Sequence, residues 1–331
     1  MQAVQLAAKR TRGLNRLLAL LVCATLSSAG AQTFTVSVGA LSAAGPLSPQ
    51  VELALDGGRV GTTTVSLALA YRNAAQLSLG ISENLSFGPL GNVVFGFTTS
   101  LRTDAAAQAE LTARGVIGPV ALRVALGAFT HQTQRFEPGA ATATARPLLT
   151  GANGSESGFS VRLGGSGRLN RSLVLEAEPE LYLVNGGTAL RLESRLRWLR
   201  AFADNELRAA VRAYSAPTMG ESHLGIGFGI VLGRGRAPDW TFTASAGYSH
   251  GRLLPGASAE IVERFEGGQI LSLSAAAEPY RRDIAPYRAA ASFETGLGPG
   301  TLKVAGSAAH VTGAGPLMSV TVGYSLPVNL R

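Results

Sequence analysis

Thiols and long apolar runs are scarce in this sequence. Cys23 is the only cysteine. It lies within the first 31 residues, which we interpret below as a cleaved leader, and without them the chain has no thiol for a disulfide or a cysteine-ligated metal site. After residues 17–26, no apolar run approaches the ~20 residues that a membrane-spanning helix needs. These absences exclude a disulfide-stabilised domain and a helical membrane protein, although 46% of the residues are hydrophobic.

The first 31 residues have the pattern of a secretory signal peptide. Four basic residues and no acidic one precede the short apolar run at 17–26. Ala29-Gly30-Ala31 then fits the small-x-small rule for cleavage. We predict export, cleavage after Ala31, and one mature domain over residues 32–331.

Much of the basic charge lies in this leader. The whole chain has 29 Lys and Arg against 21 Asp and Glu, and four of the basic residues precede the apolar run, which leaves 25 against 21. Such a balance is typical of a mildly basic solvated surface. Nucleic acid is therefore not an expected partner.

Apolar and polar residues alternate almost everywhere after Gln32, as in the segments 65–71 and 224–232. Strict alternation is typical of strands with two different faces. Turn signals such as Gly57-Gly58, Gly88-Pro89 and Gly118-Pro119 separate these segments. The segments are mostly longer than the usual soluble strand of about 5–6 residues, and they fit the ~9–11 residues of a tilted transmembrane strand. The pattern predicts an all-β fold, a transmembrane antiparallel up-and-down β-barrel.

Seventeen segments are candidate strands: 33–43, 50–57, 60–72, 75–87, 92–103, 106–117, 120–131, 157–169, 172–184, 187–199, 205–215, 221–233, 239–250, 268–279, 286–297, 300–311 and 317–328. Single-chain bacterial barrels have an even number of strands. Either 258–265 is an additional strand, or 50–57 does not pair. We expect about sixteen strands, with fourteen to eighteen allowed.

The longest connection, residues 131–156, is rich in Ala, Thr, Gly and Pro. It follows an odd number of strands after Gly88-Pro89 and Gly118-Pro119, so it belongs at the opposite rim. Outer-membrane barrels have short periplasmic turns and longer external loops. We expect this loop outside the cell or folded into the pore.

The two predicted strands of 172–199 indicate which face is inside. Leucines occupy one face, whereas glutamates and arginines occupy the other. A basic residue facing lipid at mid-bilayer costs roughly 2–4 kcal/mol, so the charged face belongs inside. The predicted pore-lining residues are Arg162, Arg168, Glu176, Glu178, Glu180, Tyr182, Arg191, Glu193, Arg195, Arg197, Arg208 and Arg212. The alternative is a soluble two-sheet sandwich with a solvated charged face, but such sheets usually alternate over shorter runs.

Strand 221–233 has three glycines, Gly225, Gly227 and Gly229, on the face opposite its apolar row. Glycine within a strand often marks a close approach of another part of the chain. The row is either a smooth wall against which an in-turned loop rests, or loose packing of small residues.

The whole pattern resembles bacterial outer-membrane β-barrels of the porin-like class over residues 32–331. The resemblance lies in architecture, not in a sequence motif. It implies residence in the bacterial outer membrane, with membrane lipid and the outer-membrane assembly machinery as partners. Such barrels commonly end in an aromatic residue, whereas Tyr324 is the last aromatic here. The aromatic content of 6% also implies sparse interfacial girdles.

No catalytic arrangement is recognisable. Ser222 and Ser249 precede two of the four histidines (His131, His223, His250 and His310), but no spacing defines a nucleophile with its base. Asp56-Gly57-Gly58 is predicted to be a turn, because further carboxylates at calcium-ligand spacing are missing. We expect no enzyme activity, no metal and no cofactor.

Two functions suit such a barrel. One is a passive diffusion pore for small hydrophilic solutes; the other is a structural or adhesive barrel with a closed lumen and displayed loops such as 131–156. The predicted lining between 157 and 215 has seven arginines and four glutamates. Rings of basic side chains favour anions, so an open pore would be weakly anion-selective.

The register of the hairpin 172–199 follows from its turn. A two-residue turn at Gly186-Gly187 tolerates the positive φ that such turns need. The resulting pairs are Tyr182 with Arg191, Glu178 with Arg195, Glu176 with Arg197, and Glu180 with Glu193.

Overall fold

The structure is a computed structural model that describes residues 31–43, 48–72, 74–88, 91–132, 156–184, 187–202, 205–216, 221–233, 238–282, 285–311 and 315–329. Within these ranges the chain forms eighteen strands. Their bounds are β1 Ala31–Ala43, β2 Ser48–Val60, β3 Thr63–Arg72, β4 Ala75–Ser86, β5 Asn92–Arg102, β6 Ala107–Ile117, β7 Val120–Gln132, β8 Glu156–Arg168, β9 Leu173–Val184, β10 Gly187–Phe202, β11 Asn205–Ala216, β12 Glu221–Leu232, β13 Asp239–Ser249, β14 Arg252–Arg264, β15 Ile270–Ala277, β16 Tyr287–Leu297, β17 Gly300–Val311 and β18 Gly315–Asn329.

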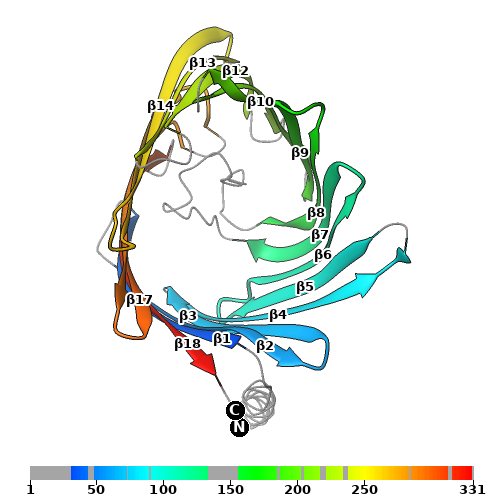
Figure 1. Ribbon diagram of the computed structural model, residues 1–331, viewed down its shortest axis with the longest axis vertical. Helices are drawn as coiled ribbons and strands as arrows, with labels where there is room; N and C mark the ends of the chain where they lie inside the picture. The colour runs from blue at the N-terminus through cyan, green and yellow to red at the C-terminus, as the bar shows by residue number, and fades with distance from the viewer. Residues whose placement is uncertain are drawn as a thin grey trace, which may run out of the picture.

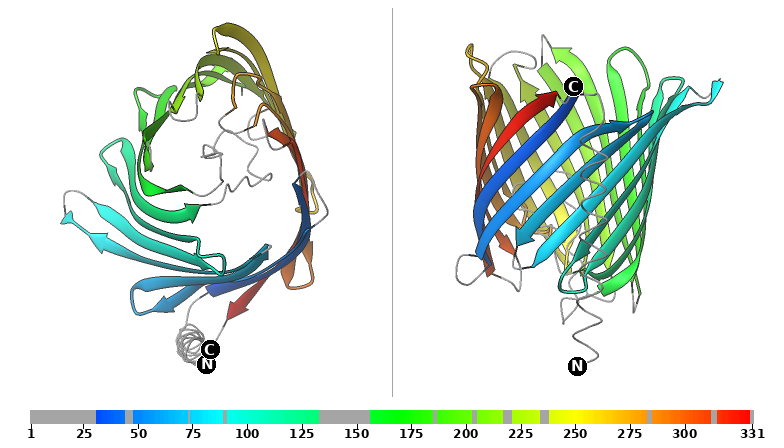
Figure 2. Two further views of the ribbon diagram at one scale, coloured as in Figure 1. Left: turned by 180° about the vertical axis from the view of Figure 1, so that it is seen from behind. Right: turned by 90° about the horizontal axis from the view of Figure 1, so that it is seen from below.

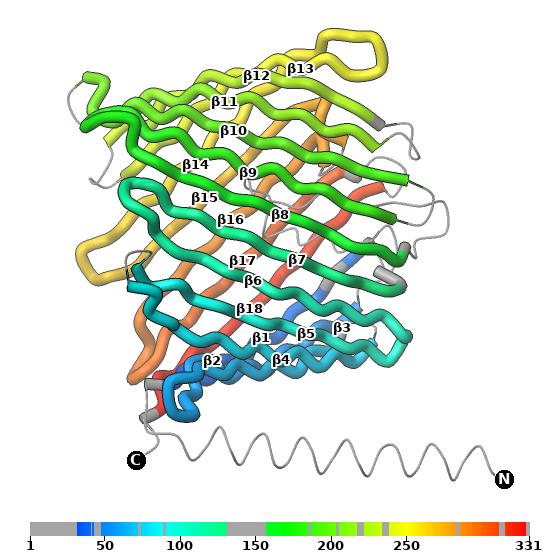
Figure 3. The backbone as a smooth tube through the Cα atoms, turned by 90° about the vertical axis from the view of Figure 1, so that its right-hand side faces the viewer, coloured from blue at the N-terminus to red at the C-terminus, as the bar shows by residue number. Residues whose placement is uncertain are grey.

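The strands form one closed antiparallel sheet in which each strand pairs with the next along the chain (Figure 1). β1 pairs with β18 along its whole length, from Ala31 opposite Asn329 to Ala43 opposite Leu317. Figure 2 shows these two strands side by side in the wall, and Figure 3 shows how strongly the strands tilt. The predicted up-and-down barrel is confirmed, and the two-sheet sandwich is wrong because the sheet closes on itself.

The strand number is eighteen, at the upper end of the predicted range rather than at sixteen. The segment 258–265 is indeed an additional strand, since most of it belongs to β14. The segment 50–57 also pairs, as part of β2, with both β1 and β3.

Gly57-Gly58 is not the turn that the sequence predicted. These residues lie within β2, and the chain reverses instead at 61–62. The register of β2 against β3 shifts between Leu55 and Gly58, and Gly57 has a φ of 81°. Glycine supplies this positive φ without a steric cost, and a β-bulge needs it as much as a turn does.

The outer wall is apolar. Leu175, Leu183 and Trp198 are exposed, whereas Glu180 and Arg191, on the opposite faces of the same strands, are 2% and 3% exposed. In a closed barrel the exposed apolar face is the outside, so this alternation places the charged side chains toward the interior. Within the described residues, no helix is long and apolar enough to cross a membrane.

Successive connections alternate between the two rims, because every pair of neighbouring strands is antiparallel. The β4–β5 and β6–β7 connections share one rim, and the β7–β8 connection is at the other, as predicted. Residues 133–155 of that connection and residues 1–30 of the predicted leader lie outside the described residues. Whether the loop enters the pore, and whether the leader is cleaved, remain predictions.

The predicted register of the β9–β10 hairpin is wrong by two residues. Val184 is opposite Gly187, so Glu180 faces Arg191, Glu176 faces Arg195, and Glu178 faces Glu193. The strands are therefore joined by residues 185 and 186. The sequence there is Asn-Gly, which is a stronger signal for a two-residue hairpin turn than Gly-Gly. A shift of two residues leaves the inner and outer faces unchanged.

Candidate functional site

Ion pairs connect the inner faces of β9, β10 and β11. Arg191 lies 3.5 Å from Glu180 across the β9–β10 pair and 3.2 Å from Glu193 on its own strand. Arg195 lies 3.3 Å from Glu193 and 3.5 Å from Glu176. Glu193 is thus shared between two arginines, which offsets the cost of burying its charge.

Further ion pairs extend this network along β10 and β11. Arg197 donates to Glu176 at 2.7 Å and to Glu206 through two nitrogens, at 2.8 and 3.0 Å. Arg208 donates its Nε to Glu206 at 2.6 Å. Arg197 and Arg208 face each other in the sheet, and the fully buried Glu206 between them removes the repulsion of two like charges.

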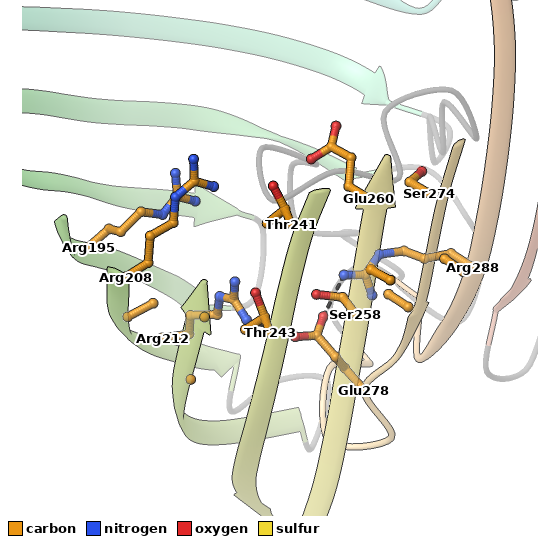
Figure 4. Close-up of a pocket in the computed structure, with 16 residues that line it drawn as sticks. Arg195, Arg208, Arg212, Thr241, Thr243, Ser258, Glu260, Ser274, Glu278 and Arg288 are labelled. Carbon is orange, nitrogen blue, oxygen red and sulfur yellow. Dashed lines mark hydrogen bonds and ion pairs between the residues drawn. The ribbon is translucent and has the colours of Figure 1, made fainter. Parts of the chain in front are cut away.

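The connection between β15 and β16, of which residues 278–282 and 285–286 are described, joins this network from another part of the wall (Figure 4). The carboxylate of Glu278 accepts a hydrogen bond from Arg212 of β11 at 2.8 Å and another from Arg288 of β16. Arg281 lies 4.0 Å from the same carboxylate. Because Arg212 also lies 3.4 Å from Glu193, one continuous network extends from β9 to β16.

Tyr280 holds the same connection against the wall. It is 1% exposed, and a β-carbon added at Gly225 would lie 2.8 Å from its ring, while one at Gly256 would lie at 3.1 Å. The glycines therefore make room for the ring. Gly225 therefore faces an in-turned segment, which is one of the two alternatives that the sequence left open for the glycine row. Gly227 and Gly229 do not, because β-carbons there would meet side chains of β13.

Two titratable groups of this connection have altered pKa values. Burial alone would raise the pKa of Glu278, but Arg281, Arg288 and Arg212 outweigh it and lower the pKa from 4.5 to about 2. Burial raises the pKa of the Tyr280 hydroxyl, and the negative charge of Glu278 raises it further. Glu278 is thus a carboxylate at neutral pH, and Tyr280 is uncharged.

We call this connected network the arginine cluster. It contains seven arginines and five glutamates, and therefore a net charge of +2. Its members are Arg191, Arg195, Arg197, Arg208, Arg212, Arg281, Arg288, Glu176, Glu180, Glu193, Glu206 and Glu278.

Four predicted lining residues lie outside the arginine cluster. Arg162 is buried and pairs with Glu110 of β6, whereas Arg168 is exposed at the end of β8. Tyr182 is buried and donates its hydroxyl to Glu180 at 2.9 Å. Glu178 makes no ion pair among the described residues and lines a cavity of about 600 Å³.

Several residues of the site were missed in the sequence. Glu206 alternates in phase with Arg208 and Arg212, so its inward position could have been predicted. Glu278 and Arg288 flank a connection rather than continuing a charged strand face, and alternation gives no information about them. The glycines of β12 indicated a close approach but not its partner.

One serine lies beside a histidine among the described residues. Ser249 Oγ is 2.9 Å from His250 Nδ1 and 3.2 Å from the carbonyl oxygen of Ser222. An activated nucleophile also needs a third group that orients the histidine, and no hydrogen bond or ion pair from His250 to a carboxylate is present within the described ranges. His223 stacks on Tyr214 and meets Tyr280 edge-on. The described ranges contain no group of three or more His, Cys, Asp or Glu residues able to hold a metal ion.

Comparison with known proteins supports the fold. No family model and no curated protein matches the chain. Among solved structures, OpdO and OpdQ of Pseudomonas aeruginosa each give a TM-score of 0.52, at 12% and 10% identity; the match covers 90% of this chain and 96% and 97% of theirs. The chain spans 60% of the length of CdiB from Acinetobacter baumannii, with a TM-score of 0.44 and 11% identity. The chain has the fold of porin-like outer-membrane β-barrels.

Proposed function

We propose that this barrel is a passive diffusion pore of the bacterial outer membrane for small hydrophilic solutes, with a weak preference for anions. The arginine cluster carries the proposal. Charged side chains line the interior of a barrel whose outer wall is apolar, and a wet lumen is the setting in which so many partly exposed arginines are stable.

The anion preference follows from the charge of the arginine cluster. Its net charge is positive, and Arg195, Arg197 and Arg208 keep 26%, 22% and 27% of their side chains exposed. Basic groups at a pore wall raise the local concentration of anions and exclude cations. Screening by salt limits the effect at high ionic strength.

Planar-bilayer recordings of the purified protein test both parts. We expect discrete conductance steps and, in a salt gradient, a reversal potential of the sign for anion preference. Arg195→Gln should reduce that preference, because it removes a partly exposed lumen charge. Arg171→Gln, in the exposed β8–β9 turn, is the matched control and should leave the reversal potential unchanged.

A structural barrel is the second candidate, and the inward residues 278–282 between β15 and β16 favour it. This connection and the arginine cluster occupy part of the lumen with buried, mutually bound side chains. Protein that inserts into the bilayer without conducting would support this function and reject the pore. Cation preference would reject the proposed role of the arginine cluster.

A further inference from the structure

A small pocket in the inner wall is lined by charged side chains of both signs (Figure 4). The cavity has a volume of about 100 Å³. Arg195 and Arg208 line one end, from β10 and β11, and Glu260 of β14 lines the other. The hydroxyl-bearing Thr241 and Thr243 of β13 lie between them.

The sheet register keeps the two ends apart. Arg208 is opposite Gly229, Gly229 is opposite Thr243, and Thr243 is opposite Ser258 of β14. Glu260 lies two residues further along β14, opposite Thr241. Three steps of ~4.8 Å separate the β11 and β14 backbones by ~14 Å. The side chain of Thr243 lies over Gly229, and the cavity beside these two residues is where a solute can lie between the two charged ends.

Both ends have hydrogen-bonding capacity to spare. Arg208 uses its Nε for Glu206, and among the described residues its two terminal nitrogens make no hydrogen bond or ion pair. Glu260 makes no ion pair or side-chain hydrogen bond within the same ranges. By contrast, Arg288, which also lines the pocket, is already bound to Glu278.

We propose that this pocket binds small zwitterions of the α-amino acid class, an inference that rests on the proposed pore function. The solute carboxylate contacts the terminal nitrogens of Arg208, since a guanidinium offers a planar pair of donors that matches a carboxylate. The solute ammonium contacts the carboxylate of Glu260. A simple anion is repelled by Glu260 and a simple cation by the arginines, so a dipolar solute of the same size fits best.

Block of the chloride current tests the proposal with solutes that differ only in their charged groups. L-Alanine has both charges, L-lactamide has neither, and L-lactate has only the carboxylate. We expect L-alanine to reduce the single-channel chloride current of the reconstituted protein saturably. L-Lactamide at equal concentration should not, and L-lactate should need a higher concentration than L-alanine.

Three variants assign the contacts. Glu260→Gln should raise the half-blocking concentration of L-alanine ~5-fold or more, without weakening the block by L-lactate. Arg208→Gln should weaken the block by both. Glu294→Gln is the matched control, because Glu294 is paired with the exposed Lys303 on β16 and β17, away from the pocket; it should change neither.

The outcomes separate this inference from the pore itself. Absence of any chloride current would overturn the proposed function. A normal current that L-alanine does not block would overturn the site alone. Equal block by L-alanine and L-lactate, unchanged in Glu260→Gln, would show an anion site and overturn the zwitterion specificity.

Discussion

The ring of Tyr280 packs so closely on Gly225 that a larger residue at position 225 needs a smaller one at position 280. The ring occupies space that a β-carbon at position 225 would need. We expect Gly225→Ala to destabilise the barrel by about 1–3 kcal/mol through overpacking. The loss should be largely relieved when Tyr280→Ala is added, which urea unfolding of both variants would measure.

Gly306→Ala is the control for that measurement. A β-carbon there would meet only the carbonyl oxygen of Ser319, at the ordinary contact distance of 3.7 Å. The variant should unfold close to the wild type. Equal losses in Gly225→Ala with and without Tyr280→Ala would disprove the steric coupling.

Glu278 makes the inward connection sensitive to acid. Its pKa falls from 4.5 in the free side chain to about 2 in the fold, a difference worth about 3 kcal/mol. Because the folded pKa is the lower one, this stabilisation is complete above about pH 4.5 and is lost as the pH falls toward 2. A spin label at Arg282→Cys, an exposed site, should become mobile over that interval.

The matched variant for this titration is Glu278→Gln. It has no carboxylate at position 278 to titrate, so the label should already be more mobile at neutral pH and should change little between pH 4.5 and 2. A label that mobilises over the same interval in both proteins would assign the transition to other lumen carboxylates.

At the level of single residues, the sequence predicted which side chains point inward better than it predicted which side chains they contact. Period-two alternation separates inward from outward side chains, because successive strand residues point to opposite faces. It therefore found Arg191, Glu193 and Arg195, which the structure joins by ion pairs. It could not find Glu278, whose three arginines come from β11, β16 and its own connection. These ion pairs form only because the barrel closes and because the β15–β16 connection turns inward.

At the level of elements, the β9–β10 hairpin gives a test of register that avoids the charged face. Ala177 is opposite Ser194 on the outer wall, and paired residues lie within disulfide range. Ala177→Cys with Ser194→Cys should crosslink on mild oxidation of the purified protein, as gel mobility or mass would show. Ala177→Cys with Leu196→Cys should crosslink poorly, since these residues are neighbours only in the rejected register.

Strand positions were predictable because length and alternation are local properties. Every candidate segment is a strand, and 258–265 is part of one. Register was not predictable from the charges, because a shift of two residues exchanges one set of Glu–Arg neighbours for another on the same face. Only the turn distinguishes the two registers, and the Asn-Gly and Gly-Gly alternatives at 185–187 overlap in the sequence.

At the level of the whole molecule, export is the prediction that the fold makes easiest to check. β1 begins at Ala31, so cleavage after Ala31 would remove a single residue of the barrel. N-terminal sequencing of protein extracted from membranes should begin at Gln32. Ala31→Asp, which breaks the small-x-small rule, should accumulate the longer precursor; mature protein that retains Met1 would contradict the prediction.

The pairing of Ala31 with Asn329 also means that the barrel has no fixed first strand. Both ends of the barrel sequence meet at one rim, where a short linker would turn them into one more hairpin. The barrel is topologically a ring that happens to be opened between β18 and β1. A circular permutant reopened at any exposed turn would inherit the same wall, the same inner face and the same neighbours for every strand.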